Sequence, residues 1–439
     1  MTQHLRISDN GRFLVRTDGT PFFWLGDTAW ELFHRLNREE ADRYLANRAQ
    51  KGFTIIQAVA LAERHGLTEP NANGDLPLVG HDPARPNEAY FAHVDSIVRK
   101  AAELGLVVGM LPTWGSYWKR DNVNAIFTAE NARTYARFLG ARYRNSPIVW
   151  ILGGDNNISN NEERAIIEAM AAGIKEGDGG DHLITFHPRG PGVSSDHFHM
   201  AEWLDFNMIQ SSHGARNHDN GLMVARDYAR RPIKPVVDGE PRYETIPVGF
   251  YFRNVDLYDR FDAFDVRQAA YWALLAGAYG HTYGNNNVWQ MWAPGREVVI
   301  GANTPWWEAL DHPGAFQMGW VRRLFDSRPF TKLVPAQEMV LDAPSSGGAK
   351  VRAACAEDGS FAFIYSPMGA PFTVDLARIQ ASRVKEIWYD PRYGASYHSH
   401  TTANMGFQTY TPPSAGRGLD WVLVLEDEAA GFPLPGSQL

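Results

Sequence analysis

The chain has 439 residues, with 42 Lys and Arg against 50 Asp and Glu, for a formal net charge of −8. This balance provides no basic field for nucleic acid or an anionic membrane surface, so neither is expected as a partner. The chain is longer than a domain with a single hydrophobic core usually is, so two domains are expected. No apolar run approaches the roughly 18 residues of a membrane-spanning helix.

The N-terminal segment and the cysteine content bear on the compartment. The segment MTQHLRISDNGRFLV lacks the apolar stretch of a secretory signal peptide. We therefore expect a cytoplasmic protein, or a periplasmic or secreted one whose leader has been removed. The single cysteine, Cys355, excludes an internal disulfide and any cluster of thiolate metal ligands.

The first 330 residues alternate short apolar runs with longer amphipathic segments. Short apolar runs bounded by turn residues are typical of buried strands. The predicted strands are Phe22–Leu25, Thr54–Leu61, Leu106–Leu111, Ile148–Leu152, Leu183–Phe186, Phe206–Ile209, Pro235–Val237 and Gly277–His281. The predicted helices are 38–51, 89–104, 128–143, 161–175, 196–204, 219–230, 265–276 and 305–326. Eight strands each followed by a helix favour a closed (β/α)₈ TIM barrel in the α/β class. An open doubly wound sheet is disfavoured because no Gly-x-Gly-x-x-Gly fingerprint follows the first strand.

After Pro329 the pattern changes to short alternating strands. Asp358-Gly359 is a hairpin signal between two of them. The predicted strands are Val351–Ala356, Phe361–Tyr365, Val384–Tyr389 and Trp421–Leu425. We therefore expect a catalytic barrel domain over residues 1–330 and a small all-β sandwich domain over residues 331–439, docked without a long linker.

Polar residues follow most of the predicted barrel strands at the end where barrel enzymes place their active sites. The strongest signals follow the fourth and seventh strands, where buried runs lead through glycine to Asp155 and Glu240. These strands lie nearly opposite each other in an eight-stranded barrel, so both carboxylates can face one cleft. Glycoside hydrolysis needs such a pair, one group as acid and the other as nucleophile or base. Asp155 and Glu240 are therefore the predicted catalytic residues.

Two further carboxylates are rivals for these roles. Strand alternation points Asp238 the same way as Glu240, although Asp238 could instead be a partner for Arg242. Asp27 follows the first predicted strand and could bind substrate hydroxyl groups.

The aromatic content is high, with 14 Trp, 17 Tyr and 23 Phe, several of them in predicted loops. Aromatic rings stack on the apolar faces of sugars, but they also serve in core packing. Together with polar residues at the strand ends, they give the candidate substrate-binding residues Asp27, Trp30, Trp114, Asn156, His187, His213, Tyr243 and Tyr283.

Other chemistries have little support. The pair His197-x-His199 lies between the fifth and sixth strands, whereas metal-dependent barrel hydrolases usually carry this motif on the first strand, so no metal is expected. No Gly-x-Ser-x-Gly elbow and no glycine-rich phosphate loop is present, so neither a serine nucleophile nor a bound cofactor is expected.

Three segments resemble a known family: Phe22–Trp30 (FFWLGDTAW), Pro147–Asn157 (PIVWILGGDNN) and Lys234–Glu244 (KPVVDGEPRYE). They resemble the apiosidase-like catalytic domain of glycoside hydrolase family 140, over about residues 5–330. The following region resembles the β-sandwich that accompanies this domain, which family descriptions name a collagen-binding domain.

The resemblance implies a retaining, exo-acting glycoside hydrolase on a (β/α)₈ barrel. Such an enzyme releases terminal β-linked apiose, a branched pentofuranose, from pectic oligosaccharides or plant glycosides. It also implies that Asp155 is the acid/base and Glu240 the nucleophile. Two alternatives remain open: a retaining glycosidase for an arabinofuranoside, a galactoside or a glucan, and a carbohydrate-binding protein without catalysis. In each case the partner is a carbohydrate.

Overall fold

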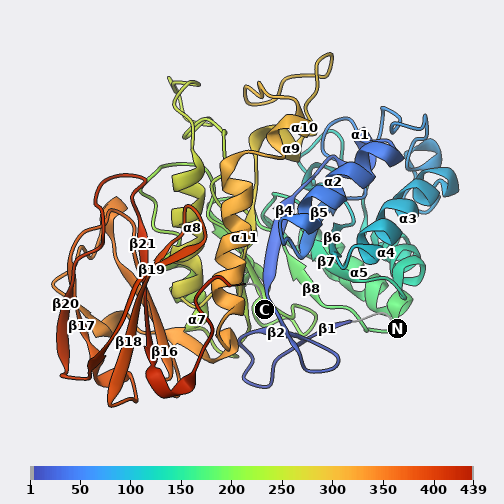
Figure 1. Ribbon diagram of the computed structural model, residues 1–439. Helices are drawn as coiled ribbons and strands as arrows, with labels where there is room; N and C mark the ends of the chain where they lie inside the picture. The colour runs from blue at the N-terminus through green and yellow to red at the C-terminus, as the bar shows by residue number, and fades with distance from the viewer. Residues whose placement is uncertain (1–3, 438–439) are drawn as a thin grey trace.

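The computed structural model describes residues 4–437, and a parallel β-barrel forms its centre (Figure 1). Within these residues the eight parallel barrel strands are β4 (Trp24–Thr28), β5 (Ile55–Val59), β6 (Val107–Leu111), β7 (Ile148–Leu152), β8 (Ile184–Phe186), β10 (Asn207–Gln210), β11 (Val236–Asp238) and β12 (Gly280–Tyr283). Strand β12 pairs in parallel with β4. The remaining seam joins β8 to the start of β10, where the Asp205 amide donates to the Ile184 carbonyl at 2.9 Å. The predicted (β/α)₈ barrel is confirmed.

Helices follow the strands, and the longer ones cover the outside of the barrel. They are α1 (Leu32–Arg35), α2 (Arg38–Gln50), α3 (Glu88–Glu103), α4 (Ala129–Tyr143), α5 (Asn161–Asp178), α6 (Ser195–Phe198), α7 (Gly221–Tyr228), α8 (Ala263–Leu275), α9 (Asn286–Trp289), α10 (Trp306–Ala309) and α11 (Pro313–Asp326). Capping boxes at Asn37, Thr128 and Asp262 begin α2, α4 and α8. No helix within residues 4–437 is long and apolar enough to cross a membrane.

Three short strands precede the barrel, and one more pairs at its edge. Strands β1 (Leu5–Ile7), β2 (Leu14–Arg16) and β3 (Pro21–Phe22) form an antiparallel sheet. Strands β1 and β2 lie at the lower end of the molecule in Figure 1, opposite the long loops at the top. Strand β9 (Gly192–Val193) pairs antiparallel with β10.

From Leu333 to Asp427, two antiparallel sheets pack face to face. The larger has the order β13 (Leu333–Pro335), β15 (Arg352–Ala356), β16 (Phe361–Ser366), β21 (Trp421–Asp427), β18 (Arg383–Asp390) and β19 (Ala395–Ala403). The smaller has the order β14 (Val340–Leu341), β17 (Phe372–Asp375) and β20 (Phe407–Tyr410). Side chains from both sheets, including Ile364, Val374 and Leu423, form a shared core. The predicted all-β sandwich is confirmed.

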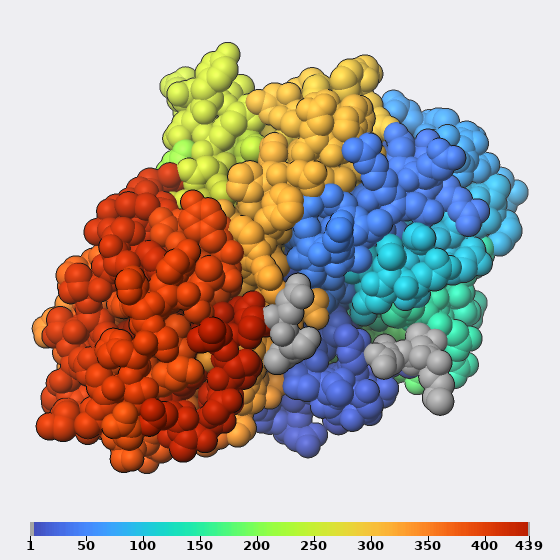
Figure 2. All heavy atoms as spheres, viewed as in Figure 1, coloured from blue at the N-terminus to red at the C-terminus, as the bar shows by residue number. Residues whose placement is uncertain are grey.

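The central strands of the larger sheet, β15, β16 and β21, are buried on both faces. On β16, Phe361, Phe363 and Tyr365 join the barrel core, while Ile364 joins the sandwich core. Tyr365 stacks on Tyr271 of α8, with ring centroids 4.6 Å apart. The sandwich therefore lies directly against α8 and α11, and the space-filling view shows the two regions in close contact (Figure 2).

Candidate active site

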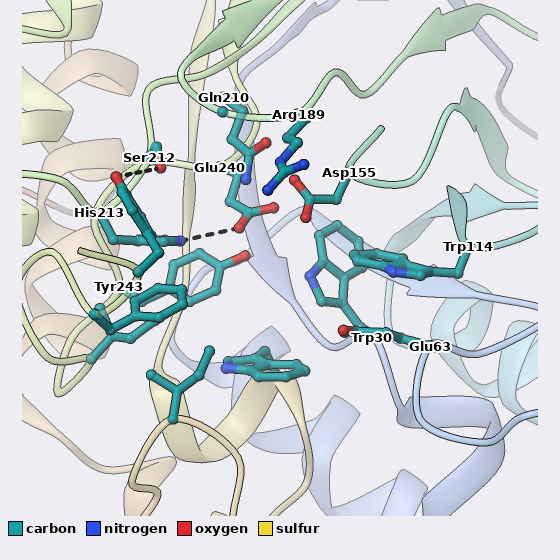
Figure 3. A pocket seen from close by; sticks show the side chains of 16 residues that line it. Trp30, Glu63, Trp114, Asp155, Arg189, Gln210, Ser212, His213, Glu240 and Tyr243 are labelled. Atoms are coloured by element: carbon teal, nitrogen blue, oxygen red, sulfur yellow. Dashed lines mark hydrogen bonds and ion pairs between the residues drawn. The ribbon is translucent and has the colours of Figure 1, made fainter. Parts of the chain in front are cut away.

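A cavity of about 330 Å³ lies at the carboxyl ends of the barrel strands (Figure 3). Its wall comes from the segments that follow several different strands, as in barrel enzymes generally. The polar and aromatic residues that line it include Trp30, Glu63, Trp114, Asp155, Arg189, Gln210, Ser212, His213, Glu240, Tyr243, Tyr251 and Trp289. Asp155 and Glu240, predicted as a pair, thus face one cavity.

Two glycines turn the backbone so that Asp155 enters the cavity. After β7 ends, Gly153, Gly154 and Asp155 have φ angles of 98°, 78° and 58°, all in the left-handed region. A Cβ atom on Gly153 would lie 2.3 Å from the His187 carbonyl oxygen, and one on Gly154 would lie 2.8 Å from that of Thr113. Neither position tolerates a side chain, and aspartate is among the residues that enter this region most readily.

The backbone also bends before Glu240. Strand β11 ends at Asp238, and the amides of Gly239 and Glu240 both donate to the Ile209 carbonyl, at 2.8 and 3.3 Å. This irregularity ends the strand alternation, so Glu240 enters the cavity and Asp238 does not. Asp238 accepts hydrogen bonds from Ser211 Oγ and Asn220 Nδ2, at 2.7 and 2.9 Å. The prediction that Asp238 faces the same way as Glu240 was therefore wrong.

Arg242, the partner that the sequence suggested for Asp238, makes other contacts. It donates to the side chain of Gln268 at 3.0 Å and to the Arg216 carbonyl. Asp238 is therefore a buried structural carboxyl, held by residues at the start of α7 and after β10.

Two histidines hold the carboxyl group of Glu240. His213 Nε2 lies 3.1 Å from one oxygen, and His187 Nε2 lies 3.1 Å from the other. Burial alone would raise the pKa of Glu240, but the contacts with His187 and His213 outweigh burial and lower it to about 2. Glu240 is therefore ionised near neutral pH.

Asp155 has the opposite electrostatic environment. Burial and then the negative charge of Glu240 raise the pKa of Asp155 to about 7, while His187, Gln210 and Arg189 act in the other direction. A substantial fraction of Asp155 is therefore protonated near neutral pH. One cavity thus holds a proton donor and an ionised carboxylate at the same pH.

Four of the eight predicted substrate-binding residues line the cavity: Trp30, Trp114, His213 and Tyr243. The rings of Trp30 and Trp114 lie 5.7 Å apart beside Asp155 (Figure 3). His187 lies behind the wall, fully buried and edge-on to Trp30, and touches Glu240 rather than the cavity space. Asn156 also lies outside the wall.

Asp27 and Tyr283 lie outside the cavity as well. They are direct neighbours on β4 and β12, and both side chains point outward to the helices. Asp27 accepts hydrogen bonds from Arg48 Nε and Tyr44 Oη, each at 2.6 Å, and Tyr283 donates to Glu244 at 2.6 Å. Both barrel strands extend beyond their predicted ends, so these residues belong to the strands rather than to the loops. Neither is retained as a substrate-binding residue.

Several cavity residues were absent from the predicted set. Gln210 ends the sixth barrel strand, and Arg189 and Ser212 follow the fifth and sixth strands, so their strand-end position was a usable signal. Glu63 follows β5 in the same way. Tyr251 and Trp289 come from the long segments after β11 and β12, where no periodicity marks a residue that folds back over the cavity.

Comparison with known families divides the chain into two matches. Residues 8–332 match the model "Apiosidase-like, catalytic domain". Residues 334–426 match the model "Putative collagen-binding domain of a collagenase". A search of the curated proteins found no match.

Two solved structures resemble almost the whole chain. One, described as "Glycoside hydrolase", has 34% sequence identity and a TM-score of 0.89, with 97% of each chain covered. The other, described as a glycoside hydrolase family 5 protein from Bacteroides vulgatus, has 31% identity and a TM-score of 0.89, covering 97% of this chain and 94% of that one. Sequence, fold and the two cavity carboxyl groups all agree with glycoside hydrolysis.

Proposed function

The chain belongs to the apiosidase-like family of glycoside hydrolases, and from this premise we propose that it is a retaining, exo-acting enzyme. Its proposed substrate is a terminal β-linked apiofuranose on pectic oligosaccharides or plant glycosides. One observation supports the two roles: in the same cavity, the pKa of Asp155 is raised and the pKa of Glu240 is lowered.

In the proposed first step, Glu240 attacks the anomeric carbon as its bond to the glycosidic oxygen breaks. Protonated Asp155 donates its proton to that oxygen, so the aglycone leaves as an alcohol and a glycosyl ester forms on Glu240. In the second step, Asp155 takes a proton from water, and the water oxygen attacks the anomeric carbon. This step releases the sugar, frees the Glu240 carboxylate and restores the proton on Asp155.

The two histidines and the aromatic wall support these roles. His187 and His213 favour the ionised form of Glu240, which is the form that can attack. The rings of Trp30, Trp114 and Tyr243 form an apolar wall that can stack on a sugar ring and exclude water from the reacting atoms.

The size of the cavity supports action on a terminal residue. Small-molecule sites range over roughly 300–1,000 Å³, and this cavity of about 330 Å³ lies at the lower end. A site of this size suits one sugar ring with part of its aglycone better than a long segment of polysaccharide.

The direct test is hydrolysis of a nitrophenyl β-apioside by the wild type, Asp155→Ala and Glu240→Ala. The wild type is expected to release nitrophenol, Glu240→Ala to lose at least about 100-fold in kcat/KM, and Asp155→Ala to lose at least about 100-fold in kcat because it lacks the base of the second step. Because nitrophenol needs little protonation, the Asp155→Ala deficit should be larger with an alkyl apioside. Glu162→Ala, at an exposed carboxylate early in α5, is the control and should keep wild-type activity. Near-wild-type activity in either cavity variant would remove that residue from its role.

A panel of aryl glycosides tests the sugar separately from the reaction. Preference for an arabinofuranoside, a galactoside or a glucoside would agree with the glycoside hydrolase assignment but would overturn the assignment of apiose as the sugar. Binding of sugars without hydrolysis of any panel member would instead support a carbohydrate-binding protein.

A further inference from the structure

A third carboxyl group, that of Glu63, faces the cavity and has no part in the proposed mechanism. Glu63 follows β5 and is half-buried in the wall. Figure 3 shows its carboxyl group turned toward the space that Trp30 and Trp114 also border, with Asp155 and Glu240 on another side of that space. A sugar whose anomeric carbon lies between the catalytic pair would place other hydroxyl groups in the same cavity.

Within residues 4–437, no group donates a hydrogen bond to the Glu63 carboxyl, and its neighbours are engaged elsewhere. The guanidinium of the adjacent Arg64 is bound to Glu297 by two hydrogen bonds of 2.6 and 2.7 Å. The buried carboxylate of Glu31 accepts hydrogen bonds from the Arg64 amide and from His34, each at 3.0 Å. The half-buried carboxyl of Glu63 therefore borders the cavity without a protein partner and is free to bind a ligand.

The charged groups around Glu63 favour its neutral form. Burial, followed by the carboxyl groups of Glu31 and Asp155, raises the pKa of Glu63 to about 8. Glu240 acts in the same direction, and Arg64 opposes it. A neutral carboxyl group has one O–H donor and a carbonyl acceptor, which complement the two hydrogen-bonding functions of a sugar hydroxyl group.

We propose that Glu63 binds a hydroxyl group of the sugar held against the catalytic pair, and that this contact selects the sugar that the enzyme accepts. The inference rests on the proposed glycosidase function and deepens it. A site built to hydrogen-bond a substrate hydroxyl discriminates against an analogue that lacks this group, because the polar side chain, covered by the bound sugar, is then left without a partner.

The test compares Glu63→Ala and Glu63→Gln with the wild type, on the aryl glycoside that the wild type cleaves fastest and on its monodeoxy analogues. Glu63→Ala should lower kcat/KM by about 10- to 100-fold, as expected for the loss of one or two hydrogen bonds. Glu63→Gln should retain most of the activity, since its amide has both a donor and an acceptor. Glu162→Gln, the same change at an exposed carboxylate early in α5, is the control and should match the wild type.

The deoxy analogues identify the contact. One of them should lower the wild-type kcat/KM about as much as Glu63→Ala does, and Glu63→Ala should lose nothing further on that analogue. Additive losses on every analogue would contradict direct binding. A Glu63→Ala deficit that grows as the leaving group becomes more basic would show that Glu63 donates a proton instead, and would also overturn the proposal.

Binding measured without turnover separates this inference from the proposed function. In a Glu240→Gln background, calorimetric affinity for the same glycoside should fall when Glu63→Ala is added. If no glycoside is cleaved but sugar binding depends on Glu63, the proposed function fails and the inference stands. If Glu240→Ala abolishes hydrolysis while Glu63→Ala changes neither kcat/KM nor affinity, the function stands and the inference fails. Melting temperatures should be no lower for Glu63→Gln than for the wild type, because the amide replaces a half-buried carboxyl that has no protein partner.

Discussion

At the scale of single residues, burial acts to raise the pKa of both catalytic carboxyl groups. Their neighbours then move the two pKa values apart. Glu240 touches two imidazoles, whereas the nearest strong influence on Asp155 is the charge of Glu240 itself. The proton therefore resides on Asp155, and the negative charge on Glu240. Since the two groups interact, they titrate as a pair, with one step near pH 2 and the other near pH 7.

The upper step predicts the alkaline limb of the activity profile. Asp155 must be protonated in the first reaction step, so kcat/KM should be high below pH 7 and fall as the pH rises through about 7. In Glu240→Gln the negative charge that raises the pKa of Asp155 is gone, so this pKa should be lower than in the wild type. Infrared difference spectroscopy of the carboxyl bands measures it directly. An unchanged Asp155 pKa in this variant would show that Glu240 does not set it.

The lower step predicts the effect of the histidines. His213→Phe preserves the ring packing against Tyr243 and Phe250 but removes the contact with Glu240. Burial acts to raise the pKa of Glu240, and His187 alone would then oppose that effect, so the pKa of Glu240 should rise. Because Glu240 attacks in its ionised form, the acid limb of kcat/KM should move to higher pH. An acid limb identical to that of the wild type would count against the role of His213.

Whether a site residue could be predicted from sequence depended on how regular the backbone is around it. Asp155 and Glu240 could be predicted because glycine follows a buried strand and a carboxylate comes next. Asp27 could not be excluded as a ligand, because the sequence did not show that β4 continues to Thr28, which places Asp27 within the strand and facing α2. Asp238 was misplaced because no sequence signal marks the point where Gly239 and Glu240 share one acceptor.

At the scale of elements, the Gly153-Gly154 segment after β7 positions the acid. Sequence predicted β7 over Ile148–Leu152, the bounds that the structure has, because all five residues are buried and apolar. The helix predicted over Asp196–Leu204 is shorter, with α6 spanning only Ser195–Phe198, since this segment has no helical periodicity to extend it. The element predicted over 305–326 is two helices, α10 and α11, with Pro313 as the first residue of α11.

Gly154→Ala should displace this segment. The substitution combines the cost of a left-handed φ, about 1–2 kcal/mol, with a Cβ atom only 2.8 Å from the Thr113 carbonyl oxygen. Both the free energy of unfolding and kcat should therefore fall. Gly180→Ala is the matched control, because its φ of 80° is similar and nothing lies within 4 Å of the added Cβ. Denaturant unfolding and turnover measurements should show a larger stability loss for Gly154→Ala and unchanged turnover for Gly180→Ala. Equal effects would mean that the close approach is unimportant.

At the scale of the whole molecule, the barrel and the sandwich share a buried polar contact as well as apolar surface. Arg267 of α8 binds Asp420, the residue before β21, through two hydrogen bonds, and Tyr365 donates to the same carboxylate at 3.0 Å. The side chains of Arg267 and Asp420 are only 2% and 0% exposed. A sequence does not show which charges will meet across such an interface, because the partners lie far apart along the chain.

Arg267→Ala should destabilise the protein by about 3–5 kcal/mol, because Asp420 would remain buried without its cation. Arg383→Ala is the control, since its ion pair with Glu428 is exposed and its loss should change stability little. The free energies of unfolding of both variants in urea give the comparison. A loss no larger for Arg267→Ala than for Arg383→Ala would contradict a stabilising role for this contact.

The central claim is that Glu240 attacks the sugar and Asp155 transfers the proton, and azide trapping tests both roles in one measurement. Azide is supplied with an aryl β-glycoside that the wild type cleaves, and the anomeric configuration of the glycosyl azide is determined by NMR. Asp155→Ala should give the β-azide, because azide replaces the activated water in the second step. Glu240→Ala should give the α-azide, because azide then takes the place of the nucleophile on the opposite face of the sugar. The reverse pattern, or the same configuration from both variants, would contradict the assignment.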